Sequence, residues 1–345
     1  MKKINLAILG GRPEAIKFFP LFRKMPFIIV NTGQQRELSK MMLDLFNIVP
    51  DIDLDLMKKN QSICGFLARA IKTLDDVIKN NKVDRIWVQG DTMTALAGAL
   101  VAKMNNIELV HLEAGLRTFD NKSPFPEEMN RILIDQISDI LFAPTKGNVE
   151  NLKNEGVKGK IYLVGNTVVD ALKIFSKDLW KHSPQSEKYV LATVHRRETI
   201  GNEMEEIFKA LKELNKEIKV IIPIHPNPNV KKLAKKIGIK TIPPLNYFSY
   251  LNYLKHCEYI CSDSGAAQEE PISFGKKVII LRKITERPEI IRCGYGIIID
   301  KLECSNILKN IKEFSEKKVK ITSNPFGNGN TAEKIVKIIK KIDGK

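Results

Sequence analysis

Three carboxylates stand where proton-transfer chemistry could occur: Asp91, Glu113 and Glu127. Asp91 and Glu113 each follow an apolar run typical of a buried strand, which places them at strand ends. Because the three lie far apart along the chain, only the fold could bring them together. Clustered carboxylates suit proton transfer, since burial and mutual repulsion raise a pKa toward neutrality. Ordinary ion pairing with nearby arginines is the alternative, and Glu127 could also be an acidic first-turn residue of a helix.

Other polar clusters also follow predicted strands. His195 comes directly after the apolar run 190–194, Asp263-Ser264-Gly265 follows the run 259–262, and Gly10-Gly11-Arg12 follows the first strand. Ligands of open parallel sheets bind beyond the carboxyl ends of the strands. The sequence therefore predicts acidic, basic and cationic side chains at the sheet edges where a ligand can bind.

The charged groups at these edges favour an anionic ligand, specifically a diphosphate. Ser264 can cap the helix expected to follow it, and Gly265 lets an anion approach backbone N–H groups, although a plain helix N-cap is the alternative. The chain contains neither G-x-G-x-x-G nor G-x-x-x-x-G-K-[ST], which disfavours nicotinamide and P-loop sites. Guanidinium groups suit bidentate phosphate contacts. Arginines in or beside strand-end turns are Arg12, Arg117, Arg131, Arg196, Arg197, Arg282 and Arg287.

Strand and helix patterns alternate along the whole chain, which predicts an α/β protein with parallel sheets covered by helices on both faces. The predicted strands are Ile4–Leu9, Phe27–Val30, Arg85–Gln89, Ile107–His111, Ile140–Ala143, Lys160–Val164, Tyr189–Val194, Val220–Pro223, Tyr259–Ser262, Lys277–Leu281 and Gly296–Ile299. The helices between them include Gln61–Lys79, Thr92–Lys103, Glu203–Leu214 and Gly265–Phe274.

The predicted strands are too many for a single doubly wound sheet, so we expect two domains. The stretch Lys181–Glu187 has linker composition, and we place an N-terminal domain over residues 1–170 and a C-terminal domain over residues 171–330. A last amphipathic helix is predicted over about Thr331–Ile342.

Composition narrows the class of protein. The chain has 345 residues, 43% of them hydrophobic and 28% charged, which is typical of a globular protein and excludes disorder. The net charge of +16 comes from lysines spread over polar helix faces, so we expect neither nucleic acid nor a membrane as partner. No uncharged stretch is long enough to span a bilayer and the first residues read as a buried strand, so we expect a cytoplasmic protein. Five scattered cysteines predict free thiols without a zinc site.

A series of sequence blocks closely resembles the non-hydrolysing UDP-N-acetylglucosamine 2-epimerases, and the blocks occur in family order. In the first half they are Gly11-Arg-Pro-Glu-Ala-Ile-Lys17, Asn31-Thr-Gly-Gln34, Gly90-Asp-Thr92, His111-Leu-Glu-Ala-Gly-Leu-Arg-Thr118 and Pro124-Phe-Pro-Glu-Glu-Met-Asn-Arg131. In the second half they are Gly165-Asn-Thr167, Thr193-Val-His-Arg-Arg-Glu198, His225-Pro-Asn-Pro-Asn229, Asp263-Ser-Gly265, Gln268-Glu-Glu270 and Thr285-Glu-Arg-Pro-Glu289.

The resemblance implies a glycosyltransferase-B-like fold, in which two Rossmann-like domains face a central cleft and the last helix, within residues 331–345, packs back on the first domain. It also implies interconversion of UDP-GlcNAc and UDP-ManNAc by a homodimer, with no nicotinamide, metal or other cofactor. In such enzymes the C2 proton leaves as UDP departs from C1, giving 2-acetamidoglucal, and UDP then adds back. The product of such enzymes enters cell-envelope polysaccharide.

The resemblance also assigns roles to particular residues. The catalytic set is Asp91, Glu113, Glu127 and His195, and the resemblance does not say which carboxylate takes the C2 proton. The substrate-binding set is Arg12, Lys17, His225, Tyr250, Ser264, Gly265, Ala266, Glu270 and Arg287. In this set Glu270 is expected at the ribose hydroxyls and Tyr250 at the uracil, where a core aromatic on a helix is the alternative for Tyr250.

The chain departs from the family pattern at several positions. Gln35 replaces a histidine of a second, regulatory UDP-GlcNAc site, Gly11 replaces a threonine, and Ala266 replaces a glycine. The nearest rival function is the hydrolysing sibling, which releases ManNAc and UDP, but that branch typically has arginine where this chain has Thr92. A glycosyltransferase of the same fold and a non-catalytic nucleotide-sugar sensor are further alternatives.

Overall fold

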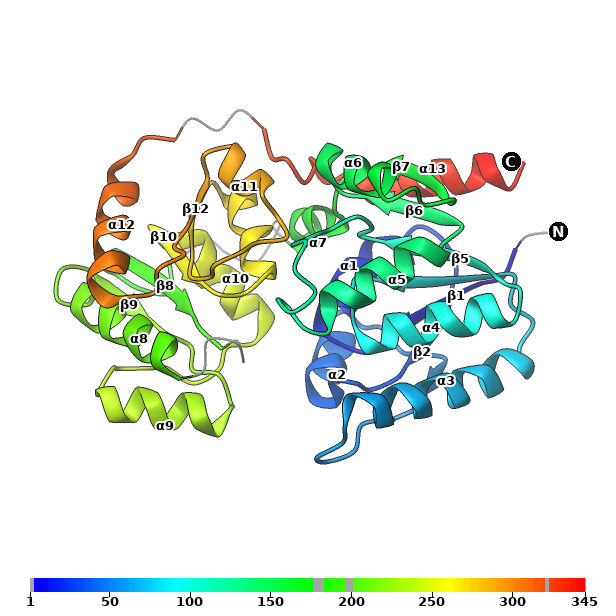
Figure 1. Ribbon diagram of the computed structural model, residues 1–345, viewed down its shortest axis with the longest axis horizontal. Helices are drawn as coiled ribbons and strands as arrows, with labels where there is room; N and C mark the ends of the chain where they lie inside the picture. Colours follow the sequence, from blue (N-terminus) through cyan, green and yellow to red (C-terminus); the bar gives the residue numbers. More distant parts are fainter. Residues whose placement is uncertain (1–2, 176–182, 196–200, 320–322, 345) are drawn as a thin grey trace. The chain divides into compact units, whose positions relative to one another are not determined.

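The chain folds into two compact α/β units (Figure 1). The computed structural model describes residues 3–175, 183–195, 201–319 and 323–344. Unit 1 comprises Met1–Ala171 together with Phe326–Lys345, and unit 2 comprises Leu172–Pro325. The last helix therefore belongs to the unit that holds the first strand.

Unit 1 is built on a seven-stranded parallel sheet in the order β3-β2-β1-β4-β5-β6-β7. After β1 the chain adds β2 and β3 on one side and then crosses to the other side for β4. β1 and β4 therefore flank the switch point, the place where open α/β sheets bind ligands beyond the carboxyl ends of their strands. The strands are β1 (Asn5–Leu9), β2 (Ile28–Asn31), β3 (Ile52–Asp53), β4 (Arg85–Gln89), β5 (Glu108–Leu112), β6 (Ile140–Ala143) and β7 (Lys160–Leu163).

Helices pack along this sheet, and α4 lies very close to it. α4 packs against β1, β4 and β5, with α3 and α5 beside it, while α1 contacts β4, α2 and α13. A Cβ atom at Gly98 of α4 would come within 2.7 Å of Ile8 and 2.9 Å of Val88, so the close approach requires glycine. The helices are α1 (Arg12–Phe22), α2 (Arg36–Leu45), α3 (Ile63–Lys79), α4 (Met93–Met104), α5 (Glu127–Ile137), α6 (Lys146–Asn154), α7 (Thr167–Phe175) and α13 (Thr331–Ile342).

Two polar contacts attach the C-terminal segment to unit 1. The buried Asp170 carboxylate accepts hydrogen bonds from the backbone N–H groups of Thr331 (3.1 Å) and Ala332 (2.9 Å), so it caps α13. Arg85, fully buried at the start of β4, donates to Asp343 at 2.8 Å beyond the end of α13. Both ends of the last helix are therefore fixed by charged groups of unit 1.

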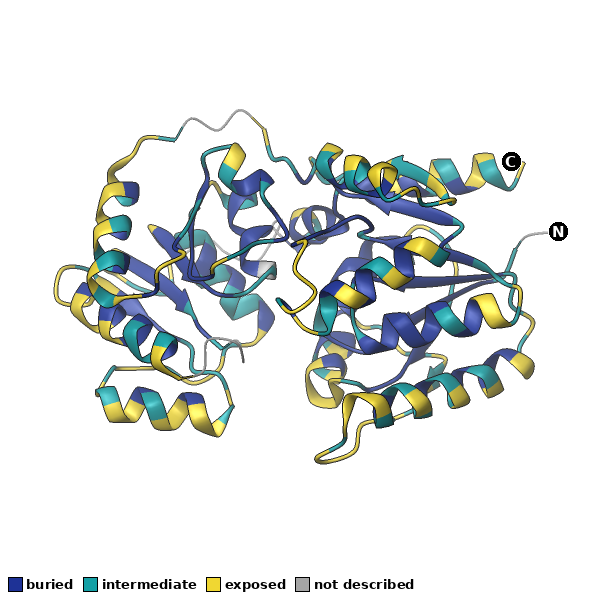
Figure 2. Ribbon diagram, in the orientation of Figure 1, coloured by how far each residue is buried: buried dark blue, intermediate teal, exposed yellow. Residues whose placement is uncertain are grey.

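Unit 2 repeats the same architecture with five parallel strands in the order β12-β11-β10-β8-β9. Its switch point lies between β8 and β10, which pair directly. Figure 2 shows the central strands of both sheets buried. The elements are β8 (Tyr189–Thr193), α8 (Asn202–Leu214), β9 (Lys219–Ile221), α9 (Pro228–Ile237), α10 (Tyr247–His256), β10 (Tyr259–Ser262), η2 (Ala266–Gln268), η3 (Pro271–Phe274), β11 (Lys277–Ile280), α11 (Glu289–Arg292), β12 (Gly296–Ile298) and α12 (Cys304–Glu316).

The predicted strands all occur, with ends that shift by a residue or two, whereas one predicted helix is wrong. The range Gly265–Phe274 forms two short 3-10 helices, η2 and η3, instead of one α-helix. Pro271 interrupts the helical hydrogen bonding, and Gly275 ends the second turn in a left-handed conformation at φ 68°. Lys181 and His182, at the start of the predicted linker, lie outside the described residues. In the described part of the chain, no helix combines the length and the apolar character needed to cross a bilayer.

The capping of α13 gives a stability prediction. Asp170→Ala should lower the free energy of unfolding by about 1–3 kcal/mol, because two buried N–H groups lose their acceptor. Glu333→Ala, on the exposed first turn of the same helix, is the control and should change it by less than about 0.5 kcal/mol, since its ion pair with Lys337 is solvent-exposed. Urea unfolding measures both variants, and equal losses would contradict the capping role.

Candidate active site

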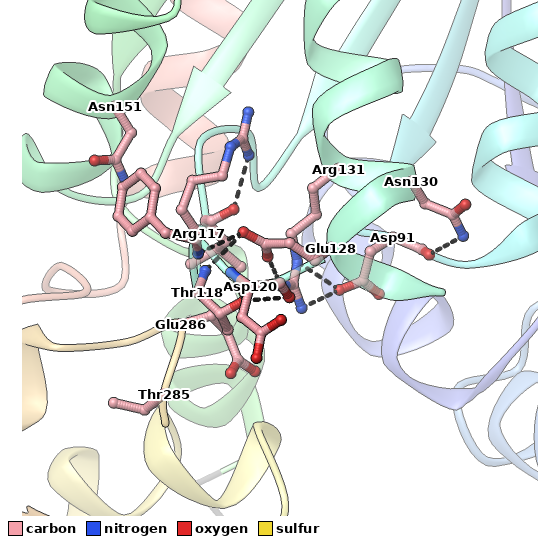
Figure 3. Close-up of polar contacts among 12 residues, drawn as sticks. Asp91, Arg117, Thr118, Asp120, Glu128, Asn130, Arg131, Asn151, Thr285 and Glu286 are labelled. Carbon is pink, nitrogen blue, oxygen red and sulfur yellow. Dashed lines mark hydrogen bonds and ion pairs between the residues drawn. The ribbon is translucent and has the colours of Figure 1, made fainter. Parts of the chain in front are cut away.

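Asp91 lies on the turn between β4 and α4, where the switch point of unit 1 opens. Gly90 turns the chain in a left-handed conformation (φ 68°), and Thr92 caps α4 by accepting from Ala95 N at 3.0 Å. The Arg131 guanidinium of α5 contacts the Asp91 carboxylate through Nε at 2.9 Å and Nη2 at 2.6 Å. Figure 3 shows the Asp91 carboxylate turned toward this guanidinium. Arg131 therefore fixes the direction of the Asp91 carboxylate.

A second carboxylate, Glu128, shares the same arginine. Arg131 Nη1 donates to Glu128 Oε2 at 2.6 Å, and Glu128 Oε1 accepts from the backbone N–H groups of Thr118 (2.8 Å) and Phe119 (2.9 Å) (Figure 3). Glu128 is fully buried, whereas the predicted Glu127 is half-buried at the first position of α5. Glu128 thus connects the loop after β5 to α5, a role that could not be predicted from the acidic start of the helix.

Glu113 follows β5 and accepts from three side chains of unit 1. Lys17 of α1 forms a short ion pair with Glu113 Oε2, and the side-chain amides of Gln89 and Asn166 donate to the same oxygen at 3.2 Å each. Glu113 also holds a left-handed backbone conformation (φ 69°), which is uncommon for a residue with a side chain and tends to occur at functional sites. Its side chain is 7% exposed, so these donors supply the hydrogen bonds that a nearly buried carboxyl group needs.

Asp91 and Glu113 follow adjacent strands, and the strand register explains why they lie at one edge. Gln89 of β4 pairs with Leu112 of β5, and Gly90 N donates to Leu112 O at 3.0 Å. The two carboxylates therefore leave the same carboxyl edge of the sheet, as the sequence predicted. The predicted Arg12 is the first residue of α1, which starts at the neighbouring end of β1.

Glu14 is a buried carboxyl group that sequence analysis did not single out. It is fully buried and accepts hydrogen bonds from Thr92 Oγ1 at 2.6 Å and from Gly10 N at 3.2 Å, with Gly11 N as a further donor. Burial raises the pKa of Glu14 from 4.5 to about 7, the hydrogen bonds oppose this rise, and the charge of Asp91 adds to it. The backbone N–H groups of the glycine turn after β1 therefore donate to the protein's own carboxyl group.

His111 lies on β5 beneath the Asp91 turn. Its Nε2 contacts the carbonyl oxygen of Gly90 at 2.9 Å and its Nδ1 contacts Asp135 Oδ1 at 2.7 Å. The two contacts connect the backbone of the Asp91 turn, through the His111 ring, to the carboxylate of Asp135 on α5. Burial opposes the ionisation of Asp135, but the charges and hydrogen bonds of His111 and Arg117 outweigh it and hold the pKa of Asp135 below its ordinary value.

In unit 2, His195 follows β8 and Asp263 follows β10, on the two strands that flank the switch point. His195 N donates to Asp263 Oδ2 at 2.9 Å, and His195 Nδ1 lies 3.6 Å from Asp263 Oδ1. The ring of His225 stacks on that of His195, with 5.1 Å between centroids. His225 Nδ1 accepts from Asn227 N at 3.2 Å, which fixes the ring beside His195.

The predicted anion-binding loop contains Ser264 and Gly265, next to the guanidinium of Arg287. A Cβ atom at Gly265 would lie 2.9 Å from both Arg287 Nη1 and Glu286 Oε1, so a larger residue would displace these side-chain ends from the loop backbone. Arg287 is buried and pairs with Glu269 (Nε to Oε1, 2.6 Å) and with Glu286. Ser264 N donates to Ser262 Oγ at 3.0 Å, and the predicted Ala266 begins the short helix η2.

The remaining predicted residues of unit 2 form a third group. Glu270 is buried and its Oε1 accepts from Tyr247 Oη at 2.8 Å, a contact that the sequence did not predict. Tyr250 is half-buried on α10 and stacks on Tyr247, with 6.4 Å between ring centroids. The predicted Arg196 and Arg197 lie outside the described residues. Among the described residues, no group of three or more His, Cys, Asp or Glu is placed to hold a metal ion.

Comparison with known proteins identifies the family. A family model for UDP-N-acetylglucosamine 2-epimerase matches residues 22–340. The chain belongs to this family. Bacillus subtilis UDP-N-acetylglucosamine 2-epimerase is 38% identical, over 97% of this chain and 95% of that protein.

Two solved structures of related proteins are similar over nearly the whole chain. S. aureus MnaA, solved with UDP, has a TM-score of 0.92 and 38% identity, covering 99% of this chain and 97% of that one. The Neisseria meningitidis UDP-GlcNAc 2-epimerase bound to UDP-GlcNAc has a TM-score of 0.90 and 36% identity, covering 98% and 99% respectively. These likenesses confirm the predicted fold class, a glycosyltransferase-B-like α/β protein with two parallel sheets.

Two departures of this epimerase-family chain from the sequence pattern are linked in the structure. The Gln35 side-chain oxygen accepts from Arg12 N at 3.3 Å, at the start of α1. The same oxygen lies 2.8 Å from where a Cβ atom of Gly11 would be. Gln35 therefore occupies the space that a side chain at position 11 would need, and it supplies the acceptor that the N-cap residue Gly11 lacks.

Glu14 gives a prediction for stability against pH. Between its ordinary pKa of 4.5 and about 7, the native protein holds a proton that the unfolded chain has lost. Stability therefore falls as pH rises through this window, by about 3 kcal/mol in total. Glu14→Gln removes the ionisable group, so between pH 5 and pH 8 the variant should gain up to about 3 kcal/mol relative to the wild type. Urea unfolding at the two pH values measures this, and an unchanged difference would contradict the raised pKa.

Proposed function

We propose that this protein catalyses the reversible epimerisation of UDP-GlcNAc to UDP-ManNAc without net hydrolysis. A base takes the proton from C2, the C–H electron pair forms the C1–C2 double bond, and UDP leaves with the electrons of the C1–O bond. UDP then attacks C1 of 2-acetamidoglucal while a proton reaches the opposite face of C2. Family membership supports the substrate, and relatives solved with UDP and with UDP-GlcNAc support it further.

The observation that carries the proposal is the pair of carboxylates at one edge of the unit 1 sheet. Proton removal and return on opposite faces of one carbon call for two acid–base groups, and Asp91 and Glu113 are such groups at adjacent strand ends. Each is held by a cation, Arg131 for Asp91 and Lys17 for Glu113, which keeps it oriented and available as a base. Glu127, at the start of α5, is the third candidate, and the order in which the groups act stays open.

Departure of UDP requires stabilisation of negative charge on the diphosphate. The loop Ser264–Gly265, the buried Arg287 and the stacked pair His195–His225 are suited to this in unit 2, since backbone N–H groups, guanidinium and imidazole all stabilise phosphate oxygens. Asp263 holds His195 in place beside this loop. We propose that Glu270 accepts from the ribose hydroxyls and that Tyr250 contacts the uracil.

The non-hydrolysing branch is favoured by Thr92. Its hydroxyl donates to Glu14 and accepts from Ala95 N, so two hydrogen bonds of the Asp91 turn depend on a small hydroxyl side chain at this position. The resemblance implies that members of the hydrolysing branch have arginine at this position. Arginine has no hydroxyl group and would not form these two hydrogen bonds. We therefore expect both sugar epimers to remain attached to UDP.

The function is tested by NMR of the purified protein with UDP-GlcNAc in D2O. We expect a mixture of UDP-GlcNAc and UDP-ManNAc with deuterium at C2, because the proton exchanges with solvent-equilibrated carboxyl groups. Free ManNAc with stoichiometric UDP would instead place the protein in the hydrolysing branch. Tight binding with no chemical change would overturn both enzymatic functions.

A substitution separates proton transfer from binding. Glu113→Gln should lower kcat by about 100- to 10,000-fold, because the amide cannot take or give the proton, while binding of UDP persists. Glu108→Gln, at the opposite end of the same strand, is the control and should retain kcat within about two-fold, since it lies away from the carboxyl edge. An active Glu113→Gln enzyme would exclude Glu113 from proton transfer.

A further inference from the structure

Glu14 joins the turn that carries Asp91 to the glycine turn after β1. Its carboxylate accepts from Thr92 Oγ1 on the first of these turns and from Gly10 N and Gly11 N on the second. We propose that Glu14 is a positioning residue for proton transfer: its ionised carboxylate holds the Asp91–Thr92 turn in the active arrangement, and protonation reverses its hydrogen bond with Thr92 and shifts the turn from that arrangement. This inference rests on the proposed function of Asp91.

The hydrogen-bond lengths fit an ionised carboxylate. The Thr92 Oγ1 to Glu14 Oε1 distance of 2.6 Å lies in the range of an O–H donor to a charged oxygen. Thr92 Oγ1 also accepts from Ala95 N, so its proton is directed to Glu14. The three donors therefore all point at the carboxyl group, and none of them needs a proton on Glu14.

Helix capping accounts for only part of this arrangement. Glu14 is the third residue of α1, and a glutamate there commonly accepts from the N-cap N–H, which is that of Gly11. Capping alone does not require the Thr92 contact, which reaches across to the β4–α4 turn. Nor does capping require the close fit at Gly10, where a Cβ atom would lie 2.2 Å from Thr94 Oγ1.

Protonation of Glu14 would reverse the contact with Thr92. Oε2 accepts from backbone, so the added proton belongs on Oε1, which then becomes a donor toward Thr92 Oγ1. Thr92 Oγ1 then accepts from both Glu14 and Ala95 N, and its own proton must turn to another acceptor, so the hydrogen bonding that positions the turn beside Asp91 changes. Because burial raises the pKa of Glu14 to about 7, this change falls in the neutral range of pH.

The charged groups around Glu14 come from two elements. Asp91, on the β4–α4 turn, is the like charge that faces it and raises its pKa. Arg12 and Lys17 lie on its own helix, and Lys17 is paired with Glu113. The loop between β2 and α2 contributes the neutral amides Gln34 and Gln35, and β1 contributes apolar residues beyond Asn5.

The experiment measures kcat and KM for UDP-GlcNAc between pH 5.5 and 9 in the wild type and in Glu14→Gln. The wild type should lose kcat on the acid side, with an apparent pKa near 7. Glutamine mimics the protonated state, so the variant should show a kcat about 10- to 100-fold lower at pH 8, a KM within about two-fold, and no acid limb near 7. Glu14→Gln is expected to fold, since it removes a buried charge.

Three further variants separate positioning from folding. Thr92→Ser keeps the hydroxyl and should retain kcat, whereas Thr92→Val should lower it, with no further loss on combination with Glu14→Gln. Asp170→Asn is the matched control, because Asp170 is another buried carboxyl whose burial raises its pKa but which holds α13 instead of the Asp91 turn. It should alter stability and leave the pH profile of kcat unchanged.

The possible outcomes distinguish this inference from the proposed function. A wild-type protein that does not epimerise UDP-GlcNAc overturns the proposed function, and the Glu14 switch is then read from the carbon-13 shift of its labelled carboxyl group and the amide shifts of Thr92. In the wild type, the carboxyl signal of Glu14 and the amide signals of Thr92 should titrate together near pH 7. In Glu14→Gln, the amide signals of Thr92 should be insensitive to pH. An acid limb that persists in Glu14→Gln, or a Thr92 amide that ignores the Glu14 titration, overturns the positioning role.

Discussion

The order of the strands is the constraint on which the rest of this structure depends. In each sheet the chain adds strands to one side and then crosses to the other, so two adjacent strands send their following turns in opposite directions. β1 and β4 flank that point in unit 1, and β8 and β10 flank it in unit 2. The turns after these strands and after β5 carry Asp91, Glu113, His195 and the Ser264–Gly265 loop.

The two switch points carry different side chains, and the proposed function assigns a different part of the reaction to each. In unit 1 the glycine turn after β1 is filled by the carboxyl group of Glu14, so its backbone N–H groups already have an anionic partner. In unit 2 a Cβ atom on Gly265, after β10, would lie 2.9 Å from both Arg287 Nη1 and Glu286 Oε1. Under the proposed function, the carboxylates of unit 1 serve proton transfer, and the guanidinium and N–H groups of unit 2 serve the diphosphate. Burial of Glu14 lowers stability at neutral pH, as expected where a site is organised for function.

Sequence patterns predicted the elements and the residues at strand ends because both depend on local periodicity. Asp91 and Glu113 follow apolar runs, and the parallel topology then determines the edge on which they lie. Glu14 was missed because its role depends on burial against Thr92, a long-range contact without a local pattern. Gln89 and Asn166 were missed for the same reason, since only the fold brings their amides to Glu113. The predicted helix after Gly265 was wrong because its apolar residues serve two short turns instead of one helical face.

The most direct test of this account is a crystal structure of the protein with UDP-GlcNAc bound. The account predicts the diphosphate at the carboxyl ends of β8 and β10, in contact with Gly265 and Arg287, and C2 of the sugar within reach of the Asp91 and Glu113 carboxylates. It also predicts that the glycine turn after β1 still holds the Glu14 carboxylate. A diphosphate bound to that turn with Glu14 displaced, or bound on the lysine-rich surface of α9, would contradict it.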